Sequence, residues 1–188
     1  DEDYDCNIMT VTPGTNTLAL NDGYKVNIGG YNVYSATTDY IGSNYVLCSY
    51  FYRQSTSTWK QAIQFFDCSG STVTVKSRYD VVSTGNPNYA NICWNPDTER
   101  FILMYRIGEG NDNVLYYQNY KHSNYYASSA QSETVISNNA SALKHLSANG
   151  LSLVYDKDEK HIYGIYKEGS DTKWIKFTTT CSYCCSST

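Results

Sequence analysis

Short apolar runs alternate with short polar segments along most of the chain. In residues 91–118, an apolar run at 92–94 leads into the turn sequence Asn-Pro-Asp-Thr at 95–98, and a second run at 101–105 is apolar throughout. A continuous run of this length between turn signals is typical of a strand buried on both faces. Proline and asparagine in the first turn favour a tight reversal, and a third run follows at 114–117. The segment therefore predicts three strands in a meander.

The same order of strands and turns recurs on both sides of this segment. Before it, strands are expected at 45–53 and 59–66; after it, they are expected at 151–155, 161–167 and 173–177. In each unit one buried strand ends in a tyrosine followed by a cation, namely Tyr52-Arg53, Tyr105-Arg106 and Tyr166-Lys167. The three cations are 53 and 61 residues apart. Internal repeats of this kind predict a propeller, a solenoid or another array of repeated units.

We therefore predict an all-β fold in a single domain, residues 1–188, built from three four-stranded antiparallel repeats in a β-propeller-like arrangement. The repeats span approximately 17–79, 80–133 and 134–180. The third repeat lacks an outer strand, and the strand-like residues 8–12 would close it by covering its open edge. A β-trefoil or a β-prism is the alternative, because three units are fewer than the four to eight blades of most propellers. The central strands are expected to supply core residues, namely Leu47, Phe51, Leu103, Met104, Ile162 and Ile165.

The repeated unit resembles the blades of β-propellers, and most of all the blade-type repeats of bacteriophage tail and fibre proteins. The turns at 94–97 and 155–158 carry the resemblance, together with the strands after them that end in tyrosine and a cation. The resemblance covers roughly residues 17–177. It implies blade-like sheets and a virion tail or fibre domain that binds a host receptor.

Composition and charge exclude two classes of partner. Hydrophobic residues make up 41% of the chain and charged residues 17%, which is typical of a globular protein. The formal net charge is −4 and no basic cluster is present, which argues against nucleic acid as a partner. No apolar run reaches the length of a membrane span.

Tyrosine and the repeated cations supply the candidate binding residues. The chain has 20 tyrosines, whose amphipathic rings suit contacts with sugars or neighbouring chains. The densest group is Tyr116, Tyr117, Tyr120, Tyr125 and Tyr126. The repeated cations are Arg53, Arg106 and Lys167. They either end each strand with an ion pair or a snorkelling contact, or form a ring near the pseudo-axis that binds an acidic sugar or a partner.

Cysteine content indicates the compartment. The seven cysteines are Cys6, Cys48, Cys68, Cys93, Cys181, Cys184 and Cys185. We predict disulfides formed in an oxidising compartment, with Cys6 bridged to one of the three C-terminal cysteines. The odd number leaves one thiol free or bridged to another copy of the chain. The sequon at Asn139 predicts N-glycosylation, and the acidic opening of the chain is compatible with a mature N-terminus after signal cleavage.

A metal site would combine the C-terminal cysteines with one of the histidines, His122, His145 or His161. A second Cys-x-x-Cys or a histidine pair at ligand spacing is missing from the sequence. We therefore predict neither a metal nor a cofactor.

The acidic residues do not predict an enzyme. Pairs such as Asp97/Glu99 and Asp156/Asp158 have the residue types of a glycoside hydrolase, but acids are also ordinary solvated residues of turns. No Gly-x-Ser-x-Gly motif occurs, so no catalytic residue is predicted. The expected function is a secreted, non-enzymatic structural or adhesive module at an extracellular surface, which self-assembles or binds glycans. The alternatives are a virion tail or fibre domain that binds a host receptor, and a glycan-processing enzyme.

Overall fold

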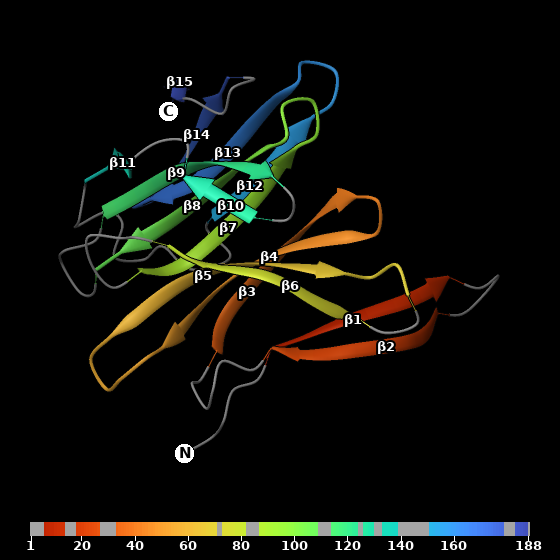
Figure 1. The fold of residues 1–188 in the computed structure, drawn as a ribbon. Helices are drawn as coiled ribbons and strands as arrows, with labels where there is room; N and C mark the ends of the chain where they lie inside the picture. Colours follow the sequence, from red (N-terminus) through yellow and green to blue (C-terminus); the bar gives the residue numbers. More distant parts are fainter. Residues whose placement is uncertain are drawn as a thin grey trace.

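The computed structural model describes residues 6–13, 18–26, 33–70, 73–81, 87–108, 114–123, 126–129, 133–138, 151–178 and 183–187. All regular secondary structure in these residues is β-strand (Figure 1). The strands up to residue 80 are β1 (Cys6–Pro13), β2 (Leu18–Val26), β3 (Val33–Gly42), β4 (Tyr45–Arg53), β5 (Trp59–Asp67) and β6 (Thr74–Asp80). Those between residues 87 and 137 are β7 (Pro87–Asn95), β8 (Arg100–Ile107), β9 (Val114–Ser123), β10 (Tyr126–Ser129) and β11 (Thr134–Ser137). The remaining strands are β12 (Leu151–Asp156), β13 (His161–Glu168), β14 (Asp171–Phe177) and β15 (Tyr183–Ser187).

The strands form three antiparallel sheets and a separate hairpin. The first sheet has the order β3-β4-β5-β6, and the third has the order β12-β13-β14-β15. In the second sheet the order is β7-β8-β9, with both β10 and β11 paired to β9. β1 and β2 pair with each other. The prediction of an all-β fold of antiparallel sheets is confirmed, and the described sheets do not close into a barrel.

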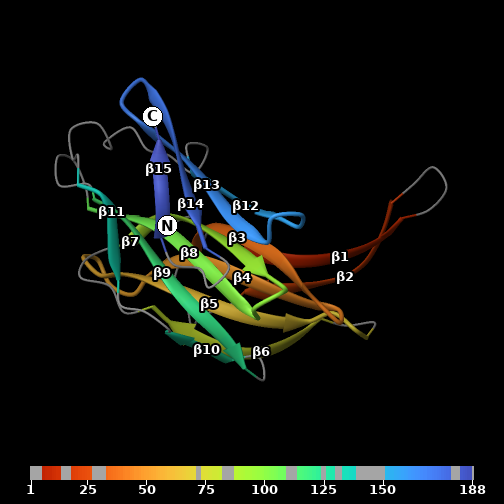
Figure 2. The same ribbon diagram turned by 90° about the horizontal axis from the view of Figure 1, so that it is seen from above.

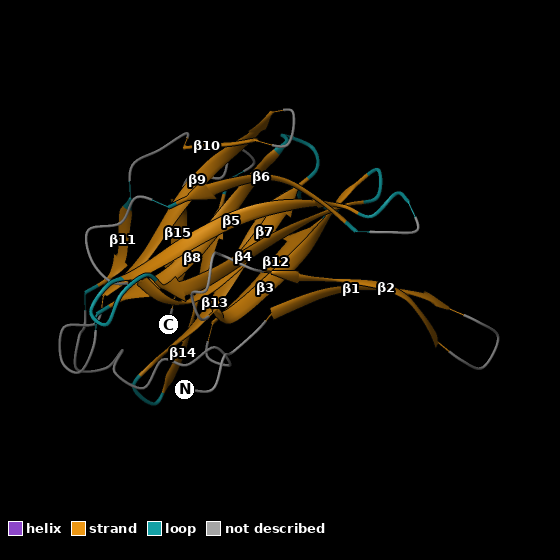
Figure 3. Cartoon of the chain, turned by 60° about the horizontal axis from the view of Figure 1, so that its bottom comes forward, coloured by secondary structure: helices purple, strands orange, loops and turns teal. Residues whose placement is uncertain are grey.

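The three sheets lie face to face, with the second between the first and the third (Figure 1). Their first strands lie side by side, because β3 contacts β7 and β7 contacts β12. At the other edge of the stack β10 lies beside β6 (Figure 2). The β1–β2 hairpin projects away from the stack (Figure 3).

The second and third sheets begin with the same hairpin. In β7–β8 the Asn95 side-chain oxygen accepts a hydrogen bond from the Asp97 backbone N–H at 3.0 Å. In β12–β13 the Asp156 carboxylate accepts one from the Asp158 N–H at 2.8 Å. Both are the local turns that Asn and Asp favour. The turn of each hairpin also has one residue with a positive φ, Glu99 or Lys160, and these two residues are 61 positions apart, as the repeat predicts.

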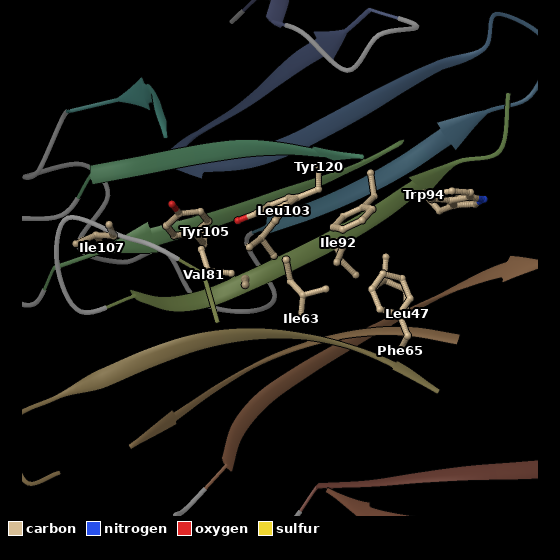
Figure 4. Packing of buried hydrophobic residues seen from close by; sticks show 12 residues of the cluster. Leu47, Ile63, Phe65, Val81, Ile92, Trp94, Leu103, Tyr105, Ile107 and Tyr120 are labelled. Carbon is tan, nitrogen blue, oxygen red and sulfur yellow. The ribbon is translucent and has the colours of Figure 1, made fainter. Parts of the chain in front are cut away.

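The first core layer lies between the first and second sheets (Figure 4). Leu47 of β4 and Ile63 of β5 are fully buried there with Leu103 of β8. Phe65 packs edge-on against Phe101, with ring centroids 6.3 Å apart. Burying each such side chain contributes roughly 1.5–3 kcal/mol, so this layer holds the first sheet on the second.

The second core layer lies between the second and third sheets. Ile102 and Met104 of β8 pack there with Ile162, Ile175 and Phe177 of the third sheet. Residues 101–107 of β8 are all buried. Alternate residues of the strand serve the two layers, as the period of two requires. The prediction that this strand is buried on both faces is confirmed.

The face of the first sheet that points away from the second is also buried. Two tyrosines of this face have hydroxyl partners: Tyr50 donates to Gln64 Oε1 at 2.9 Å, and Arg78 Nη2 donates to the Tyr52 hydroxyl at 2.6 Å. The buried members of this cluster are Val33, Cys48, Tyr50, Tyr52, Ala62, Phe66 and Val73. This end of the stack is therefore covered rather than open to solvent.

The central strands are where the sequence places them, with one exception in the core. The predicted strand at 45–53 coincides with β4, and those at 101–105 and 161–167 lie within β8 and β13. Five of the six predicted core residues are buried. Ile165 was expected in the core, but it is 47% exposed. Its side chain points to the outer face of the third sheet, which no described sheet covers.

The prediction that residues 8–12 close the third repeat is wrong. These residues do form a strand, β1, but it pairs with β2, and β15 occupies the place beside β14. A strand that follows β14 along the chain reaches this edge through a short connection, at less loop-closure entropy than a strand from the other end. Residues 134–137 also differ from the prediction, since they pair with β9 of the second sheet as β11 instead of opening the third repeat.

Candidate functional site

A groove of about 530 Å³ runs along the first strands of the three sheets. It is lined by residues 38–42 of β3, residues 91–94 with Pro96 at the end of β7, and residues 153–155 of β12. Each of these strands is an edge strand of its sheet in the described part of the chain. The groove thus has backbone edges on its walls as well as side chains.

Two side chains cross-link these edges. The Asp39 carboxylate of β3 accepts a hydrogen bond from the Trp94 backbone N–H of β7 at 2.7 Å. The Asn91 side-chain amide of β7 donates to the Leu151 carbonyl of β12 at 3.4 Å. Polar groups of edge strands are thereby bonded across layers, which holds the three strands in place and protects their edges from pairing with other chains.

Asp39 has an unusual environment for a carboxylate. Its second oxygen accepts a hydrogen bond from the Tyr40 N–H at 2.9 Å. Burial raises the pKa of Asp39, and the N–H donors of Trp94 and Tyr40 oppose that rise. Among the described residues that line the groove, Asp39 carries the only carboxylate. Both of its oxygens are used in holding the backbone.

A second polar cluster joins the turns of the second and third sheets. The Tyr155 hydroxyl donates to Asp97 Oδ2, and Lys160 Nζ lies 3.3 Å from Asp97 Oδ1. The hydrogen bond from Tyr155, helped by Lys160, lowers the pKa of Asp97. Burial and the bond to Asp97 raise the pKa of Tyr155 to about 12. Tyr155 therefore keeps its proton at neutral pH and remains a donor at the end of the groove.

The aromatic side chains of the groove differ in exposure. Tyr40 is 60% exposed, and its hydroxyl accepts a hydrogen bond from the Asn44 N–H at 3.3 Å. Trp94 is buried, with its ring edge-on to His122 at a centroid distance of 5.5 Å. Tyr40 therefore offers an accessible aromatic face to a ligand, while Trp94 supports the groove from beneath.

The repeated cations do not line the groove. Arg53 donates to the carbonyl oxygens of Ser55 and Thr56 at 3.2 and 2.9 Å, so it caps its own hairpin turn. Arg106 is buried, with its guanidinium 4.9 Å from the centroid of the Tyr89 ring, and Lys167 is exposed on the outer face of the third sheet. The strands that carry them are second in their sheets, whereas the first strands line the groove. The expected ring of cations near a common axis is not among the groove residues.

The tyrosine-rich stretch mostly builds the core. Tyr117 and Tyr120 are buried in the second and first core layers, which removes them from a surface site. Tyr116 is partly buried and stacks on Tyr105, with centroids 6.1 Å apart. Tyr126 belongs to β10, and Tyr125 lies outside the described residues.

The structure describes the side chains of some of the cysteines that were predicted to form disulfides. Cys48, Cys68 and Cys93 carry thiols instead of the predicted disulfides. Cys48 lies in the outer cluster of the first sheet and Cys93 in the second core layer, so the two are separated by the first core layer. Cys6, Cys184 and Cys185 belong to β1 and β15, which are in different sheets, while Cys181 and Asn139 lie outside the described residues. The Cys6 bridge remains a prediction, without the strand pairing that motivated it.

Sequence reasoning did not identify the groove. The signal in the sequence that could have located the groove is a polar residue within the first strand of each of two sheets, Asp39 in β3 and Asn91 in β7. Nothing in the sequence shows that these two strands are neighbours. In the described part of the chain, no group of three or more His, Cys, Asp or Glu residues is placed to hold a metal ion. That part also contains no helix long and apolar enough to cross a membrane.

Searches against known protein families, curated proteins and solved structures found no match to this chain.

Proposed function

We propose that the chain is a non-enzymatic binding module whose three sheets are blade-like repeats, and that the groove along their first strands binds a glycan. The lateral contacts of β3, β7 and β12 support the blade interpretation, because the innermost strands of propeller blades line a common axis. The equivalent hairpins of the second and third sheets, 61 residues apart, support a repeated unit.

The observation that carries the proposal is the lining of the groove. The groove volume of about 530 Å³ lies within the range of small-molecule sites. The exposed ring of Tyr40 supplies an apolar face of the kind that packs on a sugar ring. Thr38 is exposed and its hydroxyl can donate to and accept from sugar hydroxyls, as can backbone groups of the three edge strands other than the Trp94 N–H and the Leu151 carbonyl, which are bonded across the layers. One aromatic face combined with many polar groups suits a neutral sugar better than an apolar ligand.

Binding without catalysis is the better interpretation of the acidic residues. Glycoside hydrolysis uses a pair of carboxyl groups about 5–10 Å apart across the bond that breaks. The described lining of the groove supplies one carboxyl, that of Asp39, and both of its oxygens accept backbone hydrogen bonds. Asp97, the acid beside Tyr155, is bound to Tyr155 and Lys160.

The extracellular setting belongs to the proposal and rests on the sequence. The sequon at Asn139 supports a secreted or surface-exposed chain, as does the predicted bridge from Cys6 to a C-terminal cysteine. Deamidation of Asn139 by a glycan-releasing amidase, read by mass spectrometry on protein from its native source, tests this directly. An unmodified Asn139 would argue against secretion.

A glycan array with matched tyrosine variants tests the binding site. Tyr40→Ala should weaken binding about tenfold, the equivalent of about 1.4 kcal/mol of lost packing on the sugar. Tyr116→Ala, which removes the same side chain from β9 outside the groove, should bind as the wild type does. Melting curves confirm that both variants are folded. Absence of binding to any glycan, or loss of binding in Tyr116→Ala alone, would overturn the proposal.

A further inference from the structure

The outer face of the third sheet exposes a contiguous apolar surface. Ile165 is 47% exposed and Trp174 is 39% exposed, and the two are cross-strand partners on β13 and β14. In the neighbouring row Val154, which is 57% exposed, is paired with Tyr163. The Tyr163 and Trp174 rings are in contact, with centroids 6.4 Å apart. We call these four side chains the outer patch.

The outer patch occupies the positions that other sheets use to bind the next layer. In the second sheet the row equivalent to Ile165 and Trp174 contains Met104 and Tyr117, which are paired across β8 and β9. Both are buried against the third sheet. In the first sheet Ile63 lies on the face that points toward the second sheet and is buried against it. The same surface is thus covered twice in this stack and open the third time.

The stack has only one open sheet face of this kind among the described residues. At its other end the outward face of the first sheet is buried, with Tyr50 and Phe66 among its covered side chains. A second copy of the chain therefore finds no matching open face for head-to-tail stacking. Two copies can instead meet through identical outer patches, which is the isologous contact of a twofold dimer.

Polar groups surround the outer patch in the pattern of an interface rim. Lys176 Nζ lies 2.8 Å from the Glu159 carboxylate and 5.3 Å from the centroid of the Tyr163 ring. Lys167 is exposed on the same face. An apolar centre with a charged rim is the usual anatomy of a protein–protein contact.

We infer that the outer patch on the third sheet is a self-association surface, where a second copy of this chain docks to form a symmetric dimer. Three strands of about seven residues, rising about 3.3 Å per residue and spaced about 4.8 Å apart, give a face of about 330 Å² per copy. Two such faces together are smaller than the roughly 1,200 Å² of standard specific complexes, so the dimer should be weak and concentration-dependent. Like the packing within one chain, it places sheet on sheet, but it joins two identical faces instead of opposite ones.

Sedimentation velocity from about 10 µM to about 1 mM protein tests the inference over the range expected for a weak complex. A reducing agent in the buffer excludes dimers made by disulfides. The wild type should shift from monomer to dimer across the series. Trp174→Ser and Ile165→Lys, made separately, should each weaken dimerisation at least tenfold, and because both side chains are exposed the variants should melt close to the wild type.

Val135→Lys is the matched control, because Val135 is 51% exposed on β11 of the second sheet. This variant should dimerise as the wild type does. A wild type that stays monomeric throughout, or a Trp174→Ser variant that dimerises as strongly as the wild type, would overturn the inference. Glycan binding is measured separately, so failure of either result leaves the other intact.

Discussion

Gly164 of β13 tests the packing within the third sheet and the contact of that sheet with Met104 of the second sheet. A methyl group at this position would lie 2.7 Å from Ile175 Cγ2, 3.1 Å from Leu153 Cδ2 and 3.3 Å from Met104 Cε. Ile175 and Met104 are fully buried, so neither can move aside without disturbing the core. Alanine in place of a strand glycine gains about 0.5–1 kcal/mol from backbone entropy. Overpacking costs typically about 1–3 kcal/mol, so Gly164→Ala should destabilise the protein by about 1–2 kcal/mol.

A double-mutant cycle isolates the part of this cost that comes from the contact between layers. Met104→Ala alone should cost about 2–5 kcal/mol through the cavity that it leaves. In Met104→Ala the methyl group that Gly164→Ala adds has more room. The double variant should therefore be destabilised by at least about 0.5 kcal/mol less than the sum of the two single effects. Urea unfolding followed by circular dichroism measures each variant.

The control cycle pairs Gly164→Ala with Leu47→Ala, which lies in the first core layer. That pair should be additive within about 0.5 kcal/mol. If Gly164→Ala combined additively with Met104→Ala, the contact of the third sheet with Met104 would be refuted. A neutral or stabilising Gly164→Ala would contradict the close packing around Gly164 within the third sheet.

Four further predictions concern hydrogen bonds, carboxyl groups and thiols. Asp39→Ala should cost about 1–3 kcal/mol, because the Trp94 N–H loses its acceptor, and hydrogen exchange at that amide should accelerate. Burial raises the pKa of Asp39, so the folded state holds this proton more tightly than the unfolded chain does. The stability of the wild type relative to Asp39→Asn should therefore fall as pH rises through the raised pKa. A difference that does not change with pH would contradict this. Burial raises the pKa of Glu168, but its bonds to a lysine and a serine outweigh that effect and lower the pKa. The Glu168 carboxylate should therefore stabilise the fold above the ordinary Glu pKa, and this stabilisation should be lost as pH falls through the lowered pKa. Acid unfolding curves of Glu168→Gln should not show that loss. Cys48 and Cys93 are buried thiols and should react with iodoacetamide only after denaturation; their recovery as disulfides in a peptide map would be the contrary result.

The sequence predicts the centre of each sheet better than its edges. Residues 101–105 could be assigned because a short unbroken apolar run between turn signals is typical of a strand that is covered on both faces. The turn at 95–98 could be assigned because Asn and Asp bond their own backbone there. By contrast, β1 is rich in β-branched residues and β15 in small ones, and no local pattern decides which of them pairs with β14.

Exposure and the groove depend on neighbours that the local sequence does not encode. Met104 and Ile165 lie in similar apolar strands, yet one is buried and the other is exposed, because only the second sheet has a further layer on that side. The groove brings together β3, β7 and β12 from distant parts of the chain. Their cross-links, through Asp39 and Asn91, become visible only when the sheets are stacked. Tyrosine frequency pointed instead to β9, where two of the tyrosines fill the core.

An NMR titration of the ¹⁵N-labelled protein with the best glycan from the array tests the groove most directly. The account predicts that amide shifts concentrate in residues 38–42 of β3, 91–94 of β7 and 153–155 of β12, the three walls of the groove. They should saturate together with one dissociation constant, and Tyr40→Ala should weaken all of them in parallel. Shifts confined to β9 and its tyrosines, or no shifts at saturating glycan, would contradict the assignment of the binding site to the groove.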